Sequence, residues 1–302
     1  MNSNFGTAIN SKIDLINSLP VISGYYLVLG GGKIGNKFVE YAKKHNLPFI
    51  LVIDIDCEAP ASMNADILSD KDNLIEAINS LSIHKTGYYN SKWDQETAAY
   101  GSDIYFYCMD VKDIPSLLVH GIPEYIVPAI PSHAAVDIVV DFLRFDGNRK
   151  TVQELSIDEE DNESSELFNN MVSAFPEDIV AGKVPEDGTI FFSYARPGKM
   201  CPDNCKGQEG YCYTFERVKP KTITSYVRER AKRQAGWVFE SYQMGPGIGG
   251  IRGIDLKENL ILIMKHVCCL KEDSSGLSSE DRYFFIATTC NCHGILNMLY
   301  VV

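Results

Sequence analysis

The chain has 302 residues, of which 45% are hydrophobic and 23% are charged. This composition excludes a wholly disordered, collagen-like or coiled-coil chain. The 40 acidic residues outnumber the 28 basic ones, and the net charge of -12 disfavours nucleic acid and anionic membranes as partners. The start of the chain lacks a basic segment followed by an apolar one, and no apolar run reaches the ~18 residues of a membrane helix. We therefore expect a soluble, cytoplasmic protein.

In the first half of the chain, short apolar runs alternate with helical patterns, which is typical of parallel strands joined by helices. Strands are predicted at 25–29, 49–53, 103–108 and 124–127, and helices at 34–45, 73–81 and 134–145. The expected fold class is therefore α/β, with a doubly wound parallel sheet in this half.

The middle of the chain is acidic: seven acidic residues and no basic one lie between Glu154 and Glu166. Self-repulsion favours a solvated connection, and the alternative is the charged face of a helix that continues to Phe175. We place domains at 1–148 and 187–302, joined by an acidic linker at 149–186. The second domain is predicted to be cysteine-rich α/β, with strands at 189–194, 237–241 and 282–287 and helices at 222–234, 255–269 and 293–299.

A glycine-rich loop follows the first predicted strand. Gly30, Gly32 and Gly35 form G-x-G-x-x-G, and Asp54 lies 24 residues beyond Gly30, at the end of the second strand. The first glycine permits a tight turn, the second lets a pyrophosphate approach the backbone, and the third lets the helix pack on the strand. Free amides at the helix start favour an anion, and a carboxylate at the strand end suits the ribose hydroxyls of NAD and repels the phosphate of NADP.

Residues 25–56, YYLVLGGGKIGNKFVEYAKKHNLPFILVIDID, resemble the Rossmann dinucleotide-binding unit. The ending VIDID is especially similar to the NAD-binding domains of bacterial potassium-uptake regulators. The resemblance covers about 30 residues and implies a Rossmann-like fold that binds NAD. The cofactor contacts that it implies are Gly30, Gly31, Gly32, Lys33, Ile34, Gly35 and Asp54. Lys33 is a departure from the usual loop sequence, and its ammonium group either reaches a phosphate or points to solvent. The alternative to NAD binding is a Rossmann-like scaffold that has lost its nucleotide.

A second glycine cluster, residues 245–253, also contains G-x-G-x-x-G. Pro246 and the delayed helix, for which Asp255 and Glu258 form a capping box, favour an ordinary flexible loop over a phosphate site. In the functional alternative this segment is a lid, and Arg252 supplies a cation.

The cysteines of the second half predict a metal or redox site. Cys201, Cys205 and Cys212 share one polar loop, and Cys290, Cys292 and His293 follow the last predicted strand. Loops that follow parallel strands meet at one sheet edge, and thiolates suit zinc or an iron-sulfur cluster. The spacing matches neither a zinc ribbon nor a ferredoxin, and iron-sulfur is preferred because it would complement a nicotinamide cofactor in electron transfer.

These six residues also have other interpretations. The cysteines can be free thiols, and a helix starting beside Cys292 would lower the pKa of that thiol and make it a catalytic nucleophile. Cys57 and Cys108 are expected to be buried as small apolar residues. Cys268, Cys269 and His266 are expected within an apolar helix and without a role.

His133 lies where a strand leads into a helix, close to where the reactive ring of a bound nucleotide would be. General acid or base catalysis is one interpretation. In the structural alternative Ser132 caps the helix and His133 packs or faces water.

Three functions remain in competition on sequence alone. The first is an NAD-dependent oxidoreductase with a small-molecule substrate or a redox partner protein, in which a cysteine-ligated metal or cluster lies beside the nicotinamide. The second is a nucleotide-binding regulatory or redox-sensing subunit with structural zinc and no turnover. The third is an interaction protein in which the glycine loops and thiols are only scaffold. The sequence leaves a homo-oligomer open.

Overall fold

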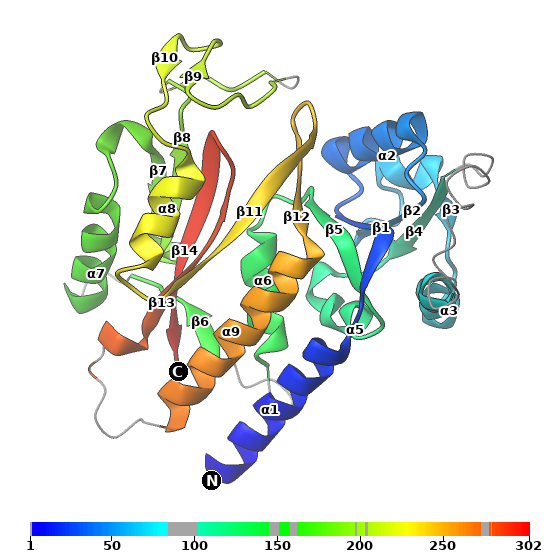
Figure 1. Cartoon of the computed structure of the whole chain (residues 1–302), viewed down its shortest axis with the longest axis horizontal. Helices are drawn as coiled ribbons and strands as arrows, with labels where there is room; N and C mark the ends of the chain where they lie inside the picture. Colours follow the sequence, from blue (N-terminus) through cyan, green and yellow to red (C-terminus); the bar gives the residue numbers. More distant parts are fainter. Residues whose placement is uncertain are drawn as a thin grey trace, which may run out of the picture. The chain divides into compact units, whose positions relative to one another are not determined.

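Figure 1 shows the computed structural model of the chain. It describes residues 2–83, 102–144, 151–157, 162–196, 198–202, 205–272, 278 and 280–302, without the side chains of residues 2–4, 82 and 83. The chain forms two compact units of mixed α/β structure. Unit 1 comprises Met1–Asp14, Val139–Gly247 and Glu258–Val302, and unit 2 comprises Leu15–Ile138 and Ile248–Lys257.

Unit 2 is built on parallel strands in the order β3-β4-β2-β1-β5, and β12 pairs antiparallel with β5. The strands are β1 (Val21–Leu29), β2 (Phe49–Asp54), β3 (Asp66–Ile67), β4 (Asp103–Cys108), β5 (Ile122–Pro128) and β12 (Ile248–Arg252). In β2 five consecutive residues are buried, as expected for a strand covered on both faces. Helices α2 (Lys33–His45), α3 (Lys71–Ile83) and α5 (Pro115–Leu118) also lie in this unit.

Helix α2 has an apolar stripe that packs towards the sheet. Phe38, Val39 and Ala42 are fully buried, at the spacing of one helix face. The helix ends at His45, and Asn46 then adopts the left-handed conformation and donates its N–H to the last turn.

Unit 1 contains strands in the order β11-β13-β14-β8-β7, with β6 paired to β14, and a separate β9-β10 hairpin. The strands are β6 (Val152–Glu154), β7 (Val180–Val184), β8 (Thr189–Ser193), β9 (Tyr211–Cys212), β10 (Arg217–Val218), β11 (Gly236–Gly245), β13 (Tyr283–Thr289) and β14 (His293–Val301). Helices α7 (Asn162–Ser173) and α8 (Ile223–Ala231) belong to this unit, and α8 contacts β11 and β13. Phe285, Leu296 and Met298 of the central strands are fully buried in its core.

Helices α1 (Asn2–Ser18), α6 (Ala134–Phe142) and α9 (Gly253–Glu272) have residues in both units. Within the described residues, no helix combines the length and apolar character that are needed to cross a membrane. The compact units do not follow the predicted domain bounds. The expected linker at 149–186 contains β6, α7 and β7, so the helical alternative describes residues 162–173.

Three sequence predictions are wrong. The predicted C-terminal helix at 293–299 is strand β14, because this segment pairs with β13 on one side and with β8 on the other. The predicted flexible loop after Gly245 contains strand β12. The predicted capping box at Asp255 is not formed, because α9 begins at Gly253 and the Asp255 carboxylate accepts hydrogen bonds from Arg252. The predicted strands at 103–108 and 49–53 are confirmed, the second with one more residue.

Candidate functional site

The glycine loop of unit 2 needs two of its glycines for its own geometry. Gly30 has a φ of +102°, which side chains rarely adopt, and its N–H donates to the Ile53 carbonyl at 2.8 Å. A side chain at Gly35 would collide with the Gly30 carbonyl. The first and third glycines of the motif therefore permit the turn and the close packing of α2.

Gly31 also has a structural reason for its glycine. Its carbonyl accepts from the Ala61 N–H at 2.9 Å, and a side chain would press on Phe106 and Ala59. Because Gly31 is buried among these groups, its side-chain position is not available to a ligand.

Gly32 differs from the other three glycines. It is the N-cap of α2, and a side chain added there would meet nothing within 4 Å. The amides of the first helical turn lack carbonyl partners within the helix and carry the positive end of its dipole. Lys33 and Ile34, which begin the helix, are exposed. An anion can therefore approach the backbone at Gly32.

Asp54 lies beside this loop at the carboxyl end of β2. Its Oδ2 accepts from the Gly31 N–H at 2.6 Å, and its Oδ1 accepts from the Asp56 N–H at 2.8 Å. A carboxylate has about four acceptor positions, so two remain for another donor. The structure thus brings together the glycine loop and the acidic residue that the sequence separates by more than twenty positions.

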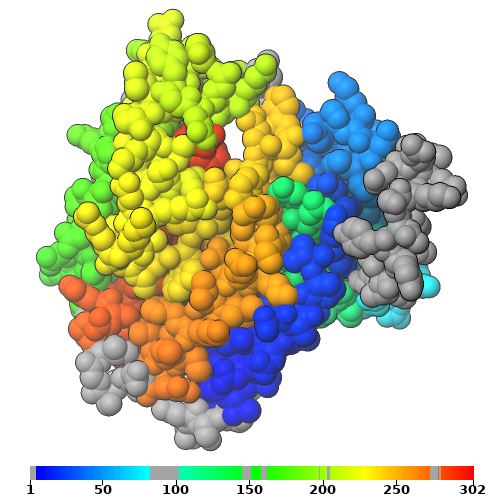
Figure 2. Space-filling view, viewed as in Figure 1, coloured from blue at the N-terminus to red at the C-terminus, as the bar shows by residue number. Residues whose placement is uncertain are grey.

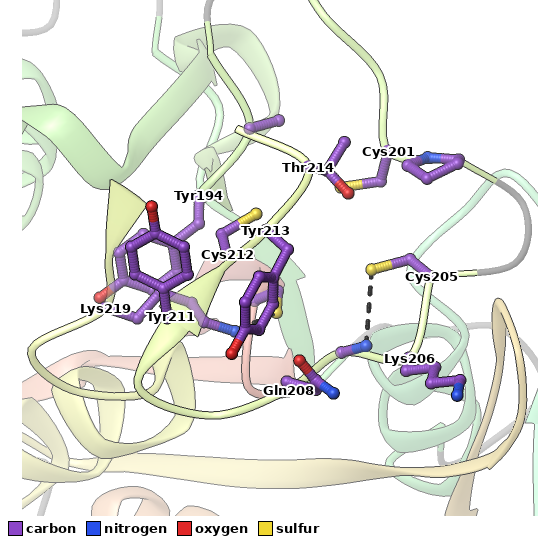
Figure 3. Close-up of a pocket in the computed structure, with 14 residues that line it drawn as sticks. Tyr194, Cys201, Cys205, Lys206, Gln208, Tyr211, Cys212, Tyr213, Thr214 and Lys219 are labelled. Carbon is purple, nitrogen blue, oxygen red and sulfur yellow. Dashed lines mark hydrogen bonds between the residues drawn. The ribbon is translucent and has the colours of Figure 1, made fainter. Parts of the chain in front are cut away.

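In unit 1, a cavity of about 450 Å³ is lined by cysteines from two parts of the chain. Cys201 and Cys205 lie in the segment after β8, Cys212 lies on β9, and Cys292 lies in the turn between β13 and β14. Figure 3 shows Cys205 and Cys212 with their sulfur atoms directed towards the space between the surrounding loops. Figure 2 shows the yellow-green segment that carries the first three cysteines at the surface of one end of this unit.

Hydrogen bonds from β11 and from the turn between β13 and β14 fix the loop that carries Cys205. Gln243 of β11 donates to the Cys205 carbonyl at 2.8 Å, and Asn291 donates to the Gly207 carbonyl at 3.1 Å. Gly207 has a φ of +58°, and its N–H donates to the Cys205 sulfur at 3.4 Å. Since Asn291 precedes Cys292, the same turn positions both cysteines.

Lys219 is a site residue that the sequence does not reveal. It lines the cavity, it is 4% exposed, and its Nζ donates to the Cys292 Sγ at 3.1 Å. Nothing in its local sequence distinguishes it from the other lysines. Its burial depends on the β9-β10 hairpin, where the Lys219 N–H bonds to the Gly210 carbonyl at 2.8 Å.

The thiols influence each other electrostatically. The pKa of Cys201 is raised to about 11, mainly by burial and to a smaller extent by the neighbouring Cys205, Cys212, Cys292 and Cys290, in decreasing order. Burial also raises the pKa of Cys292, although Lys219 acts in the opposite direction. The prediction that a helix start lowers the pKa of Cys292 is wrong, because no helix begins there.

Cys290 and His293 flank the cavity without lining it. The Cys290 N–H donates to the His293 carbonyl at 2.8 Å, closing the turn between β13 and β14. His293 Nε2 lies 3.2 Å from the Cys201 Sγ. Within the described part of the chain, no three Cys, His, Asp or Glu side chains are close enough together to hold a metal ion as they stand.

The other candidate residues do not line this cavity. His133 is 8% exposed, and its carbonyl accepts from Val136 and Asp137 in the first turn of α6, while Ser132 donates to the Asp137 carboxylate at 2.6 Å. These contacts involve the His133 backbone and the Ser132 hydroxyl, so the role of the His133 imidazole stays a prediction. Cys268, Cys269 and His266 lie in α9, as expected.

The expectation that Cys57 and Cys108 are buried apolar residues is wrong. Both are exposed, and they form a disulfide between the segment after β2 and the end of β4. In the register of these strands Cys108 lies opposite Asp54. The disulfide therefore lies at the same sheet edge as the glycine loop.

An uncharacterized protein from Archaeoglobus fulgidus is 24% identical over 275 residues, which cover 90% of this chain and 98% of that protein. No solved structure matches the chain. A family model described as "AF_1314_C: Uncharacterized protein, C-terminal domain" matches residues 135–302, which is more than half of the chain. The chain therefore belongs to this family.

Proposed function

We propose that this protein is an NAD-dependent oxidoreductase, in which unit 2 binds NAD and the thiols of unit 1 hold a soft metal or an iron-sulfur cluster. The observation that carries the proposal is the position of Asp54. Its carboxylate bonds to the glycine loop at Gly31, with acceptor capacity left over, and the backbone at Gly32 is open to an anion. A dinucleotide supplies both a diphosphate for the helix start and ribose hydroxyls for the carboxylate.

The topology of unit 2 supports the same proposal. The order β4-β2-β1-β5 corresponds to strands 3-2-1-4 of a Rossmann-like, doubly wound sheet. In such sheets ligands bind at the carboxyl ends of the strands, where the order of connection reverses. The glycine loop follows β1 at that position.

Asp54 favours NAD over NADP. An ionised carboxylate accepts hydrogen bonds from both hydroxyls of the adenosine ribose, whereas it repels a phosphate on the same ring. The exposed Lys33 and the half-buried Lys37 of α2 carry the nearby positive charges in the sequence, but neither replaces the carboxylate at the strand end.

The reaction class that NAD supports is hydride transfer with a small-molecule substrate. A substrate carbon that bears a hydroxyl group loses a hydride to the nicotinamide ring and becomes a carbonyl carbon, and the hydroxyl proton passes to a base or to water. The carbon is oxidised by two electrons, and NAD⁺ is reduced to NADH. The thiolates of unit 1 suit zinc, which would polarise an oxygen, or an iron-sulfur cluster.

The direct test is a calorimetric titration of the full chain with NAD⁺, NADH, NADP⁺ and ATP. We expect saturable binding of NAD⁺ and NADH, with NADP⁺ at least tenfold weaker. ATP separates recognition of a dinucleotide from recognition of any adenine nucleotide. Absence of NAD⁺ and NADH binding, or equal binding of ATP, would overturn the proposal.

A second function is favoured by the disulfide near Asp54. An exposed Cys57–Cys108 bond at the nucleotide-binding edge suits a redox-sensing regulatory protein without turnover. In that case reduction by a dithiol changes the affinity for NAD, and no hydride transfer is observed with any alcohol or carbonyl compound. Turnover with a substrate favours the oxidoreductase instead.

A further inference from the structure

Five cysteines of unit 1 lie after β8, on β9 or in the turn between β13 and β14, and four of them line a single cavity. They are Cys201, Cys205, Cys212 and Cys292. Cys290 is only two residues from Cys292, yet it does not line the cavity. The turn between β13 and β14 therefore directs one of its two cysteines into the cavity and not the other.

The arrangement suits a group larger than a single ion. Zinc binds thiolates at about 2.3 Å, so two sulfur atoms on one zinc are at most about 4.6 Å apart. In the described residues no three potential ligands meet at such a point, although four thiols line a space of about 450 Å³. A polynuclear centre spreads its ligands over several metal atoms, so its thiolates surround a volume.

The charge in the cavity points to the same kind of occupant. Lys219 is a buried cation, and its hydrogen-bond partner is the Cys292 sulfur at 3.1 Å. Burying an ammonium group is costly unless a negative charge lies nearby. Four thiolates bound to a metal centre supply that charge, and an N–H···S bond is one of the known means by which proteins tune iron-sulfur clusters.

We propose that Cys201, Cys205, Cys212 and Cys292 bind an iron-sulfur cluster, and that Lys219 donates a hydrogen bond to the Cys292 sulfur and thereby tunes the cluster. The proposal rests on the thiol centre of the proposed function and names its cofactor and ligands. Four thiolates are the ligand set of both [2Fe–2S] and [4Fe–4S] clusters. Cys290 and His293 are assigned no bond to the cluster.

The first test is a metal analysis of the full chain, purified without oxygen and reconstituted with ferrous iron and sulfide. After gel filtration we expect iron and acid-labile sulfide in equal amounts, with a broad visible absorption that dithionite bleaches. Zinc without sulfide, or a chain that keeps neither iron nor sulfide, would overturn the proposal.

Serine variants within one turn provide the matched comparison. Cys292→Ser and Cys205→Ser are expected to lose at least fivefold in bound iron, whereas Cys290→Ser and Cys269→Ser keep the wild-type amount. Circular dichroism establishes that each variant is folded. Equal losses in Cys290→Ser and Cys292→Ser would contradict the assignment of ligands.

The role of Lys219 is tested by potentiometric titration of the cluster. Lys219→Met removes a positive charge and a hydrogen bond, so the variant should keep its iron but show a more negative reduction potential, and Lys219→Arg should restore most of the shift. Lys206→Met removes an exposed lysine from the lining of the same cavity and serves as the control. Equal potentials for the two methionine variants would show that Lys219 does not tune the cluster.

NAD binding provides an independent readout, because its proposed residues lie in unit 2. A cluster that follows this ligand pattern in a chain that does not bind NAD would refute the proposed function and leave the cluster assignment in place. If the chain binds NAD but keeps neither iron nor sulfide, the cluster assignment is refuted and the proposed binding of NAD stands.

Discussion

Cys57 and Cys108 are joined by a disulfide that closes a chain separation of 51 residues. The bond connects the segment after β2 to the end of β4, so it restrains the edge of unit 2 at which Asp54 lies. Restraining an unfolded chain over a loop of this length stabilises the folded state by about 2–4 kcal/mol.

Removal of this disulfide should therefore lower the stability of the chain. We expect the Cys57→Ala/Cys108→Ala variant to lose about 2–4 kcal/mol in the free energy of unfolding, measured by urea titration. Cys269→Ala, which replaces an exposed free cysteine in α9, is the control and should change little. A stability equal to that of the control would mean that the bond is not formed in solution.

Asp54→Ala should weaken NAD binding. The lost hydrogen bonds to a charged acceptor are worth about 1.5–3 kcal/mol, which corresponds to about 10-fold to 150-fold in the dissociation constant. Asp56→Ala is the matched control, because that carboxylate is exposed and accepts from the Glu58 N–H at 3.0 Å. Discrimination against NADP should also fall in Asp54→Ala. Unchanged affinity in calorimetry would place the ribose elsewhere.

The glycines of the loop should separate into two groups. Gly32→Ala is expected to leave the melting temperature nearly unchanged but to weaken NAD binding about tenfold or more, since the added methyl group occupies space that only a ligand would fill. Gly35→Ala should lower the free energy of unfolding by at least about 1–3 kcal/mol, because its methyl group meets the Gly30 carbonyl. Thermal unfolding and calorimetry of both variants measure the contrast. Tight NAD binding by Gly32→Ala would argue against a diphosphate at this position.

His266 should make the stability of unit 1 depend on pH. Burial lowers the pKa of His266 below its usual value of 6.5, and its Nε2 has no hydrogen-bond partner among the described residues. The unfolded chain therefore binds the proton more readily, and the stability present above pH 6.5 is lost as the pH falls through the lower pKa of the folded state.

Urea titrations between pH 7 and pH 5 should show this loss in the wild type and a smaller loss in His266→Phe. The ring lies between Trp237 and Phe284, with centroids 5.1 and 5.8 Å away, so phenylalanine suits the same surroundings. His45→Phe, which changes an exposed histidine in α2, is the control. The same pH dependence in wild type and His266→Phe would exclude this residue as its source.

The local sequence was sufficient to predict those strands and helices whose burial pattern is regular along the element. The run from Phe49 to Ile53 and the helical spacing of Phe38 and Ala42 identified β2 and α2, because burial on both faces or on one stripe leaves a direct pattern in the chain. The glycine loop and Asp54 followed from the same local pattern, since Gly30 and Gly35 meet steric requirements of the turn from β1 into α2.

Only the tertiary structure decided the rest. The segment at 293–299 resembled a short helix, but pairing with β13 and β8 makes it a central strand, and this pairing depends on residues far away in the chain. Tertiary structure also decides that Cys57 and Cys108 form a disulfide and that Lys219 is buried. It likewise decides that Cys292, and not Cys290, lines the cavity. Each of these features depends on which loops meet at the ends of the strands. Contacts between loops that are far apart in the chain leave no repeating pattern in the sequence.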